Sequence, residues 1–142
     1  ITQAMATSFK AEILDEQHDL VADTIKIALY TSSATINATT TAYSTSNEVA
    51  NGNGYATGGV TLTNKAVSTA GASTSGGTAY FDADDPTWTS ASFTARGALI
   101  YNSTNSDKAI AVLNFGGDFT VSSGTFRIVF PAAGANAIVT IA

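Results

Sequence analysis

Short segments of alternating apolar and polar residues, separated by clusters of Gly, Asn, Ser and Asp, limit the fold of this 142-residue chain more than any other feature. In Thr24–Thr31 apolar residues fall at every second position, which is the period of a half-buried β-strand. We expect further strands at Val60–Asn64, Thr78–Asp82, Ser92–Tyr101, Ala109–Phe115, Thr120–Ser123, Thr125–Phe130 and Ala137–Ile141. About eight short strands predict an all-β fold, an antiparallel β-sandwich or a jelly-roll-like barrel.

The segments between these strands contain the residues that favour turns. Asn51–Gly59 concentrates Gly and Asn, which tolerate a positive φ, so it predicts a turn or a pair of turns. We expect a long loop, anchored by Tyr43, over Ser32–Ser46. The Gly/Ser-rich segment Ser68–Thr78 predicts an exposed hairpin tip. Shorter turns or loops are expected at Asp84–Pro86, Asn102–Asp107, Gly116–Asp118 and Pro131–Asn136.

One short helix is expected before the first strand, over Ala4–Gln17, because Met5, Phe9 and Ile13 recur every four residues. Thr7 or Ser8 would be its N-cap. We therefore divide a single domain, 1–142, into an N-terminal helical arm, 1–19, and a β core, 20–142. The helix could pack on its own domain or on a neighbouring copy, and we favour the neighbour because terminal segments are readily exchanged between protomers.

The charge of the chain argues against several classes of function. Only 12% of residues are charged, about half of the ordinary share, and 6 basic against 11 acidic residues give a net charge of −5. The basic residues are scattered singly, whereas a nucleic-acid binder needs them clustered, so we expect no nucleic-acid partner. No apolar run approaches the length of a membrane span, and the start lacks the pattern of a signal peptide. The chain has no cysteine and thus no disulfide, thiolate metal site or cysteine nucleophile.

His18 is the only histidine and so the only candidate for the base of a catalytic triad. Asp15 and Asp19 could orient its imidazole, but no serine has the G-x-S-x-G context of a nucleophile elbow. We expect His18 to be a solvated residue at the helix end, with His18→Ala nearly neutral for stability. No catalytic residue is therefore assigned, and we expect no enzyme.

Two groups of acidic residues could bind a cation or a basic partner. Asp82, Asp84 and Asp85 could offer oxygens to calcium, but the stretch lacks the remaining ligand positions of an EF-hand loop, so we favour a turn. The acidic residues of Glu12–Asp19 would point into solvent together, and their functional alternative is docking on a basic surface. The glycines of Gly52–Gly59 do not form a phosphate-binding motif. We expect no metal and no cofactor.

Four large aromatic residues allow three interpretations. Tyr43, Tyr55, Trp88 and Tyr101 could anchor the core or its loops, form a protein interface, or stack on sugars. The residues selected as a possible protein interface are Met5, Phe9, Ile13, Tyr43, Tyr55 and Trp88.

Several runs along nearly the whole chain resemble, in the same order, a family of small virion structural proteins of tailed phages. The runs are Thr2–Met5, Ser8–Lys10, Ile25–Thr31, Asn47–Val49, Gly54–Gly59, Thr61–Asn64, Phe93–Tyr101, Ser122–Gly124 and Phe130–Pro131. Ala95–Tyr101 is the most specific of them. The chain departs from the pattern at Asp15–His18, which is more acidic than usual, and at Asn114, where an acid is commoner. The resemblance implies a virion component and offers no catalytic motif.

These observations lead us to expect a capsid decoration, or cement, protein that bridges neighbouring capsomers. Its partners would be the major capsid protein or other virion proteins and further copies of itself, as a trimer, and its location would be the virion. Charge-poor, hydroxyl-rich strands suit such interfaces, because dense charge is costly to desolvate. The alternatives are a tail-tube, neck or head–tail connector component, and a host-surface adhesin that binds sugars through Trp88 and the loop tyrosines.

Overall fold

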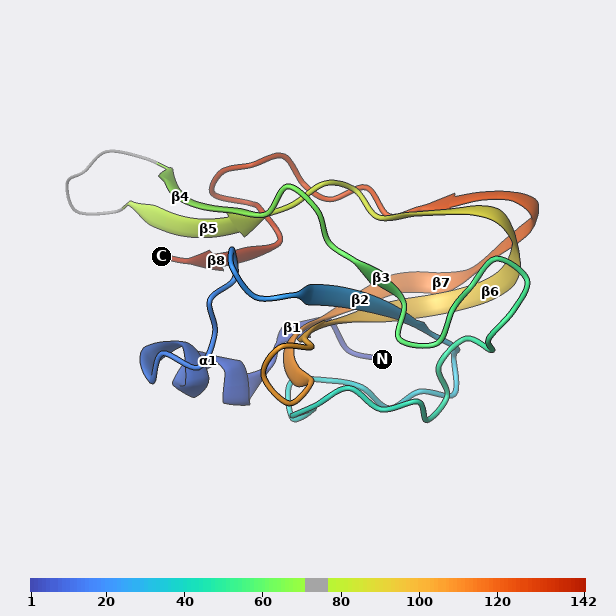
Figure 1. Ribbon diagram of the computed structural model, residues 1–142, viewed down its shortest axis with the longest axis horizontal. Helices are drawn as coiled ribbons and strands as arrows, with labels where there is room; N and C mark the ends of the chain where they lie inside the picture. Colours follow the sequence, from blue (N-terminus) through green and yellow to red (C-terminus); the bar gives the residue numbers. More distant parts are fainter. Residues whose placement is uncertain (71–76) are drawn as a thin grey trace.

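The computed structural model describes residues 1–70 and 77–142, which form two antiparallel sheets and a short helix (Figure 1). In chain order the elements are β1 (Ala4–Met5), α1 (Thr7–Leu14), β2 (Ile25–Tyr30), β3 (Val60–Thr61), β4 (Ala66–Ala70), β5 (Thr78–Asp82), β6 (Thr87–Asn102), β7 (Lys108–Arg127) and β8 (Val139–Ile141). One sheet has the order β1-β7-β6-β2-β3 and the other the order β4-β5-β8. The prediction of an all-β, sandwich-like fold is confirmed.

The core lies on β2 and on the adjoining halves of β6 and β7. In β2 every residue except Lys26 is buried, so both faces of the strand are covered and not only the face that carries Ile25, Ile27 and Leu29. The long connection between β2 and β3 runs along one side of the five-stranded sheet (Figure 1). The expected loop Ser32–Ser46 lies within this connection, whose isolated β-bridges among the described residues involve Ala42, Glu48, Gly52 and Tyr55.

Strands β6 and β7 pair with each other over most of their 16 and 20 residues and form one long ribbon. The pairing contains several register shifts, and Ser90, Gly116 and Ser123 have positive φ. Such irregularities bend a strand. The ribbon curls at the right of Figure 1 and returns above the five-stranded sheet. The prediction that Gly116–Asp118 is a turn between separate strands is wrong, because this segment is an irregularity inside β7 and the strand continues to Arg127.

The Gly-rich segment 51–59 forms the expected turns and needs its glycines. A Cβ on Gly59, whose φ is +71°, would lie 1.8 Å from the carbonyl oxygen of Ile27. A Cβ on Gly54 would lie 2.7 Å from the carbonyl oxygen of Ser90. The first contact places the turn against β2 and the second places it against the bend of β6.

The N-terminal segment differs from the expected helix of residues 4–17. Met5 lies in β1, which pairs with β7 through Ala4↔Val112 and Met5↔Ala111, and α1 covers only Thr7–Leu14. The N-cap is Ala6 and makes no side-chain capping bond, so the assignment of the cap to Thr7 or Ser8 is wrong. Phe9 is 0% exposed within its own chain. The helix therefore packs on its own domain, contrary to our preference for a neighbouring copy.

The three-stranded sheet begins with the hairpin of β4 and β5. Val67↔Phe81 and Ala70↔Thr78 are among its paired residues, so both ends of the expected tip Ser68–Thr78 belong to strands. Within that tip, residues 71–76 lie outside the described residues.

Candidate functional site

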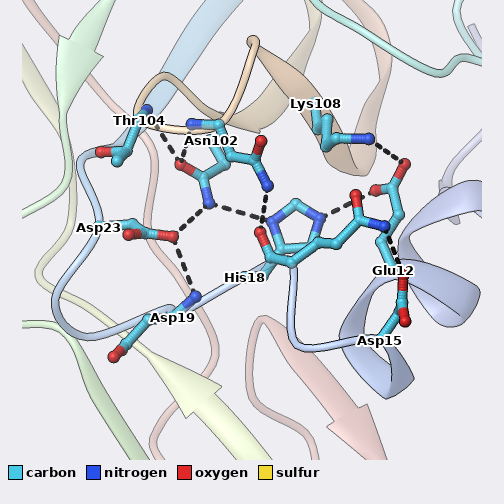
Figure 2. Close-up of polar contacts among 10 residues, drawn as sticks. Glu12, Asp15, His18, Asp19, Asp23, Asn102, Thr104 and Lys108 are labelled. Carbon is cyan, nitrogen blue, oxygen red and sulfur yellow. Dashed lines mark hydrogen bonds and ion pairs between the residues drawn. The ribbon is translucent and has the colours of Figure 1, made fainter.

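The imidazole of His18 is buried at the centre of a polar cluster between α1 and the β6–β7 hairpin (Figure 2). Its side chain is 0% exposed. The Nε2 atom lies 2.9 Å from Oε2 of Glu12, and the Nδ1 atom lies 3.1 Å from Nδ2 of Asn102. The expectation of a solvated histidine is therefore wrong, because the segment after α1 turns back onto the hairpin and covers the ring.

Asn102, which is 0% exposed, determines the tautomer of His18. Its Oδ1 accepts hydrogen bonds from the backbone N–H groups of Thr104 (3.0 Å) and Asn105 (3.2 Å). These two donors orient the amide, so Nδ2 must be the atom that faces His18 and donates to Oδ2 of Asp23 at 2.7 Å. The Nδ1 atom of His18 consequently accepts, and its Nε2–H donates to Glu12 (Figure 2).

Two carboxyl groups beside His18 are held in the charged form. Partial burial tends to raise the pKa of Glu12, but hydrogen bonds from His18 and Lys108 outweigh it and lower the pKa below the ordinary value. The Nζ of Lys108 lies 3.1 Å from Oε1 of Glu12. Burial likewise tends to raise the pKa of Asp23, whereas the hydrogen bond from Asn102 and one from the backbone N–H of Asp19 lower it.

The His18 cluster is a structural connection in this geometry. A general base must reach a substrate proton, and this ring is covered, with both nitrogens already bonded to protein groups. The hydrogen bonds of the His18 cluster instead connect the end of α1 to Asn102, the last residue of β6, and to the turn that follows β6. Sequence reasoning singled out His18 but missed Asn102, which it had placed only at the start of the predicted turn Asn102–Asp107.

A second polar cluster surrounds the carboxylate of Glu48, inside the long connection between β2 and β3. Glu48 accepts hydrogen bonds from Tyr43 Oη and Tyr55 Oη, both at 2.6 Å, and from the backbone N–H of Gly58 at 2.7 Å. Burial and the adjacent carboxylate raise the pKa of Tyr43 and of Tyr55. The phenol of Tyr55 also accepts a bond from the N–H of Leu29 in β2. The cluster thereby fixes two parts of the connection to the core.

Two of the three acidic residues before β6, Asp84 and Asp85, accept hydrogen bonds from protein groups, whereas Oδ1 of Asp82 is buried without a hydrogen-bond partner among the described residues. Asp85 accepts a hydrogen bond from the backbone N–H of Phe130 at 2.8 Å and another from Arg127 Nε at 3.1 Å, and these bonds lower its pKa. Asp84 accepts bonds from Thr63 and Asn64. Within residues 1–70 and 77–142 no group of three or more His, Cys, Asp or Glu residues could hold a metal ion. The expected turn at Asp84–Pro86 is not observed: residues 83–86 are an irregular connection between β5 and β6, and Asp85 links this connection to the end of β7 beside an open pocket of about 600 Å³.

An apolar groove of about 470 Å³ lies where β7 folds back on itself. Its apolar lining consists of Phe115, Phe119, Val121, Phe126, Ile128 and Val129. Phe119 is 53% exposed and Val129 is 72% exposed, so apolar surface is open to solvent along this side. The sequence analysis placed all of these residues except Phe119 in predicted strands, and it missed the groove because the groove is formed by the bend in the ribbon.

The six residues selected as a possible interface lie in different environments. Phe9, Tyr55 and Trp88 are at most 3% exposed, which matches the alternative that aromatic residues anchor the core. The aromatic ring of Tyr55 lies near that of Trp88, with 6.4 Å between their centroids. Met5, Ile13 and Tyr43 are partly buried against the core. An interface role for these residues stays a prediction, and Trp88 offers no exposed face for a sugar.

Comparison of the chain with models of protein families, with curated proteins and with solved structures finds no match in any of the three. The resemblance to virion proteins of tailed phages therefore stays a prediction.

None of the helices in the described residues has the length and apolar character needed to cross a membrane.

Proposed function

We propose that this chain is a structural protein of a tailed-phage particle, located on the capsid as a decoration protein that bridges neighbouring capsomers. The observation that carries the proposal is the exposed apolar surface on a chain with few charges. Large apolar side chains such as Leu14, Phe119 and Val129 face solvent, while only 12% of the residues are charged. Exposed apolar patches of this kind are typical of surfaces that bind other proteins.

The side chains of His18 and Glu48 form hydrogen bonds with groups of their own chain, and this supports a binding role over an enzymatic one. The His18 ring is covered, and the Glu48 carboxylate is occupied by three donors from its own chain. Both clusters position loops and the helix. The resemblance of runs along nearly the whole chain to virion structural proteins of tailed phages supports the phage particle as the place where such a module would act.

The mechanism of a decoration protein would be mass action. A module that binds the assembled shell, and not its dissociated subunits, shifts the equilibrium toward the shell. Several copies joined as a trimer would place several apolar surfaces on adjacent capsomers. The partners in this proposal are the major capsid protein, or another virion protein, and further copies of the chain.

Electron microscopy of purified phage particles, in which the chain is located by labelling, tests the proposal. We expect copies distributed over the head, and we expect shells supplied with the purified chain to disassemble at a higher temperature than bare shells. Copies in a stacked ring would indicate a tail-tube component, and copies at a distal tip would indicate an adhesin; either result would refute the decoration role. Particles without the chain would refute the virion assignment altogether.

A further inference from the structure

Exposed large apolar side chains occur at several places on the described part of the chain, and the two most exposed of them, Leu14 and Val129, belong to two different surfaces. Leu14 is 87% exposed at the C-terminal end of α1, and the groove in β7 exposes Phe119 and Val129. Helix α1 lies at the left of Figure 1, and the bend of the β6–β7 ribbon lies at the right. The two apolar places are therefore different in structure and far apart on one chain.

Within residues 1–70 and 77–142, no strand pairs with the outer edge of β7 along the groove. Strand β1 pairs with β7 only at Ala111 and Val112, whereas the groove is lined from Phe115 onward. Its apolar residues come from the two arms of the folded strand and from the two residues that follow it. A side chain from another molecule can enter between these arms without displacing any segment of the described chain.

The end of α1 presents one apolar side chain followed by two acids. Leu14 is followed by Asp15 and Glu16, which are both exposed. Glu16 has a φ of +56°, so the chain leaves the helix at this point and Leu14 stands at its tip. This tip is a convex apolar group with negative charge beside it.

The rim of the groove has the complementary charge. Arg127 lines the groove, and its side chain is 59% exposed, whereas its partner Asp85 is only 20% exposed. The guanidinium therefore contributes most of the accessible charge of this ion pair. Two helix tips brought together would repel each other, but a helix tip brought to the groove would place its acids near Arg127.

We propose that the groove of one copy binds the helix tip of a second copy, with Leu14 between the arms of β7 and the acids of the tip beside Arg127. The contact is heterologous, because each copy contributes a different surface. In a bound pair one copy keeps a free groove and the other keeps a free tip, so repetition gives a ring if the rotation closes and a filament if it does not. The inference rests on the self-association part of the proposed function and not on binding to a capsid.

Complementation between two single variants tests this contact. Leu14→Glu places a charge on the helix tip and leaves the groove intact. Val129→Glu places a charge in the groove and leaves the helix tip intact. Both residues are largely exposed, so the fold should persist, which thermal unfolding followed by circular dichroism verifies. Ile141→Glu is the matched control, because Ile141 is an exposed apolar residue, at 50%, that belongs to neither surface.

Sedimentation equilibrium of the full chain over a range of concentrations gives the readout. We expect the unmodified chain and Ile141→Glu to associate, and each of the other variants to weaken association by at least about 10-fold, which corresponds to about 1.4 kcal/mol. An equimolar mixture of Leu14→Glu and Val129→Glu should form a dimer and nothing larger, because only one intact pair of surfaces remains.

Three results would overturn the inference: an unmodified chain that is monomeric at every concentration, undiminished association of Leu14→Glu, or a mixture that stays monomeric. If Val129→Glu alone prevented association, two grooves would be pairing with each other. A chain that associates as proposed but is absent from phage particles would leave the inference standing and refute the proposed function.

Discussion

Replacing Asn102 with alanine tests whether the His18 cluster holds the N-terminal segment in place. The side chain of Asn102 is fully buried and makes four hydrogen bonds, two as an acceptor and two as a donor. The bond to the Asp23 carboxylate involves a charged group, a class worth about 1.5–3 kcal/mol, and the Nδ1 of His18 would lose its donor inside the protein. The two backbone N–H groups lie closer to solvent and can bind water instead. Together these losses predict a decrease of about 3 kcal/mol in the free energy of unfolding.

Urea denaturation of the monomer, at a concentration below any association, measures this decrease. Asn136→Ala is the control, because Asn136 is exposed, and it should change the free energy by less than about 0.5 kcal/mol. Hydrogen exchange should also show that the amides of α1 lose protection in Asn102→Ala before those of β2. A loss below about 1 kcal/mol, with unchanged exchange in α1, would refute the view that this cluster anchors the helix.

Three further predictions follow from packing and titration. Phe9→Ala should lower the free energy of unfolding of the monomer by about 3–5 kcal/mol, and an unchanged denaturation midpoint would contradict the burial of Phe9 in its own chain. Gly59→Ala should prevent stable folding, because its Cβ would overlap a carbonyl oxygen of β2, whereas Gly117→Ala, with open space around it, should fold; circular dichroism and melting temperature compare the two. Burial raises the pKa of Tyr30 to about 12, so the unfolded chain loses this proton first, and stability should be retained below about pH 10 and fall from there toward pH 12. A flat alkaline denaturation profile across that interval would contradict the last prediction.

The strand pattern could be read from the sequence where periodicity and turn residues agree. Thr78–Asp82 was predicted with the bounds that β5 has, and the segment 51–59 forms the expected turns. The prediction failed at Gly116–Asp118, because the same residues permit a chain reversal or a local irregularity within a strand. Pairing with β6 decides between the two, and that partner is distant in the sequence.

The N-terminal helix and His18 were misread for a related reason. A period of four residues in a short segment gave a helix from residue 4, but hydrogen bonding with β7 draws Met5 into a strand. The burial of His18 depends on Asn102, which lies 84 residues away in sequence, and no local pattern connects them. The apolar groove was equally beyond local reasoning, because its two walls face each other only after the ribbon has bent.

The apolar surfaces together suggest how weak contacts between two copies could produce a stable assembly. Complete burial of a side chain such as Leu14 or Val129 is worth about 1.5–3 kcal/mol, and part of that gain is offset by the loss of translational and rotational freedom on association. A pair of isolated chains joined by one groove and one helix tip should therefore exchange with free chains over the concentration range of the sedimentation experiment. If the chain decorates a symmetric shell, as proposed, the first contact would raise the effective concentration of the next, and the same surfaces would then act cooperatively. The shortage of charge favours this arrangement, since closely packed copies with a net charge of −5 each repel less than densely acidic ones would.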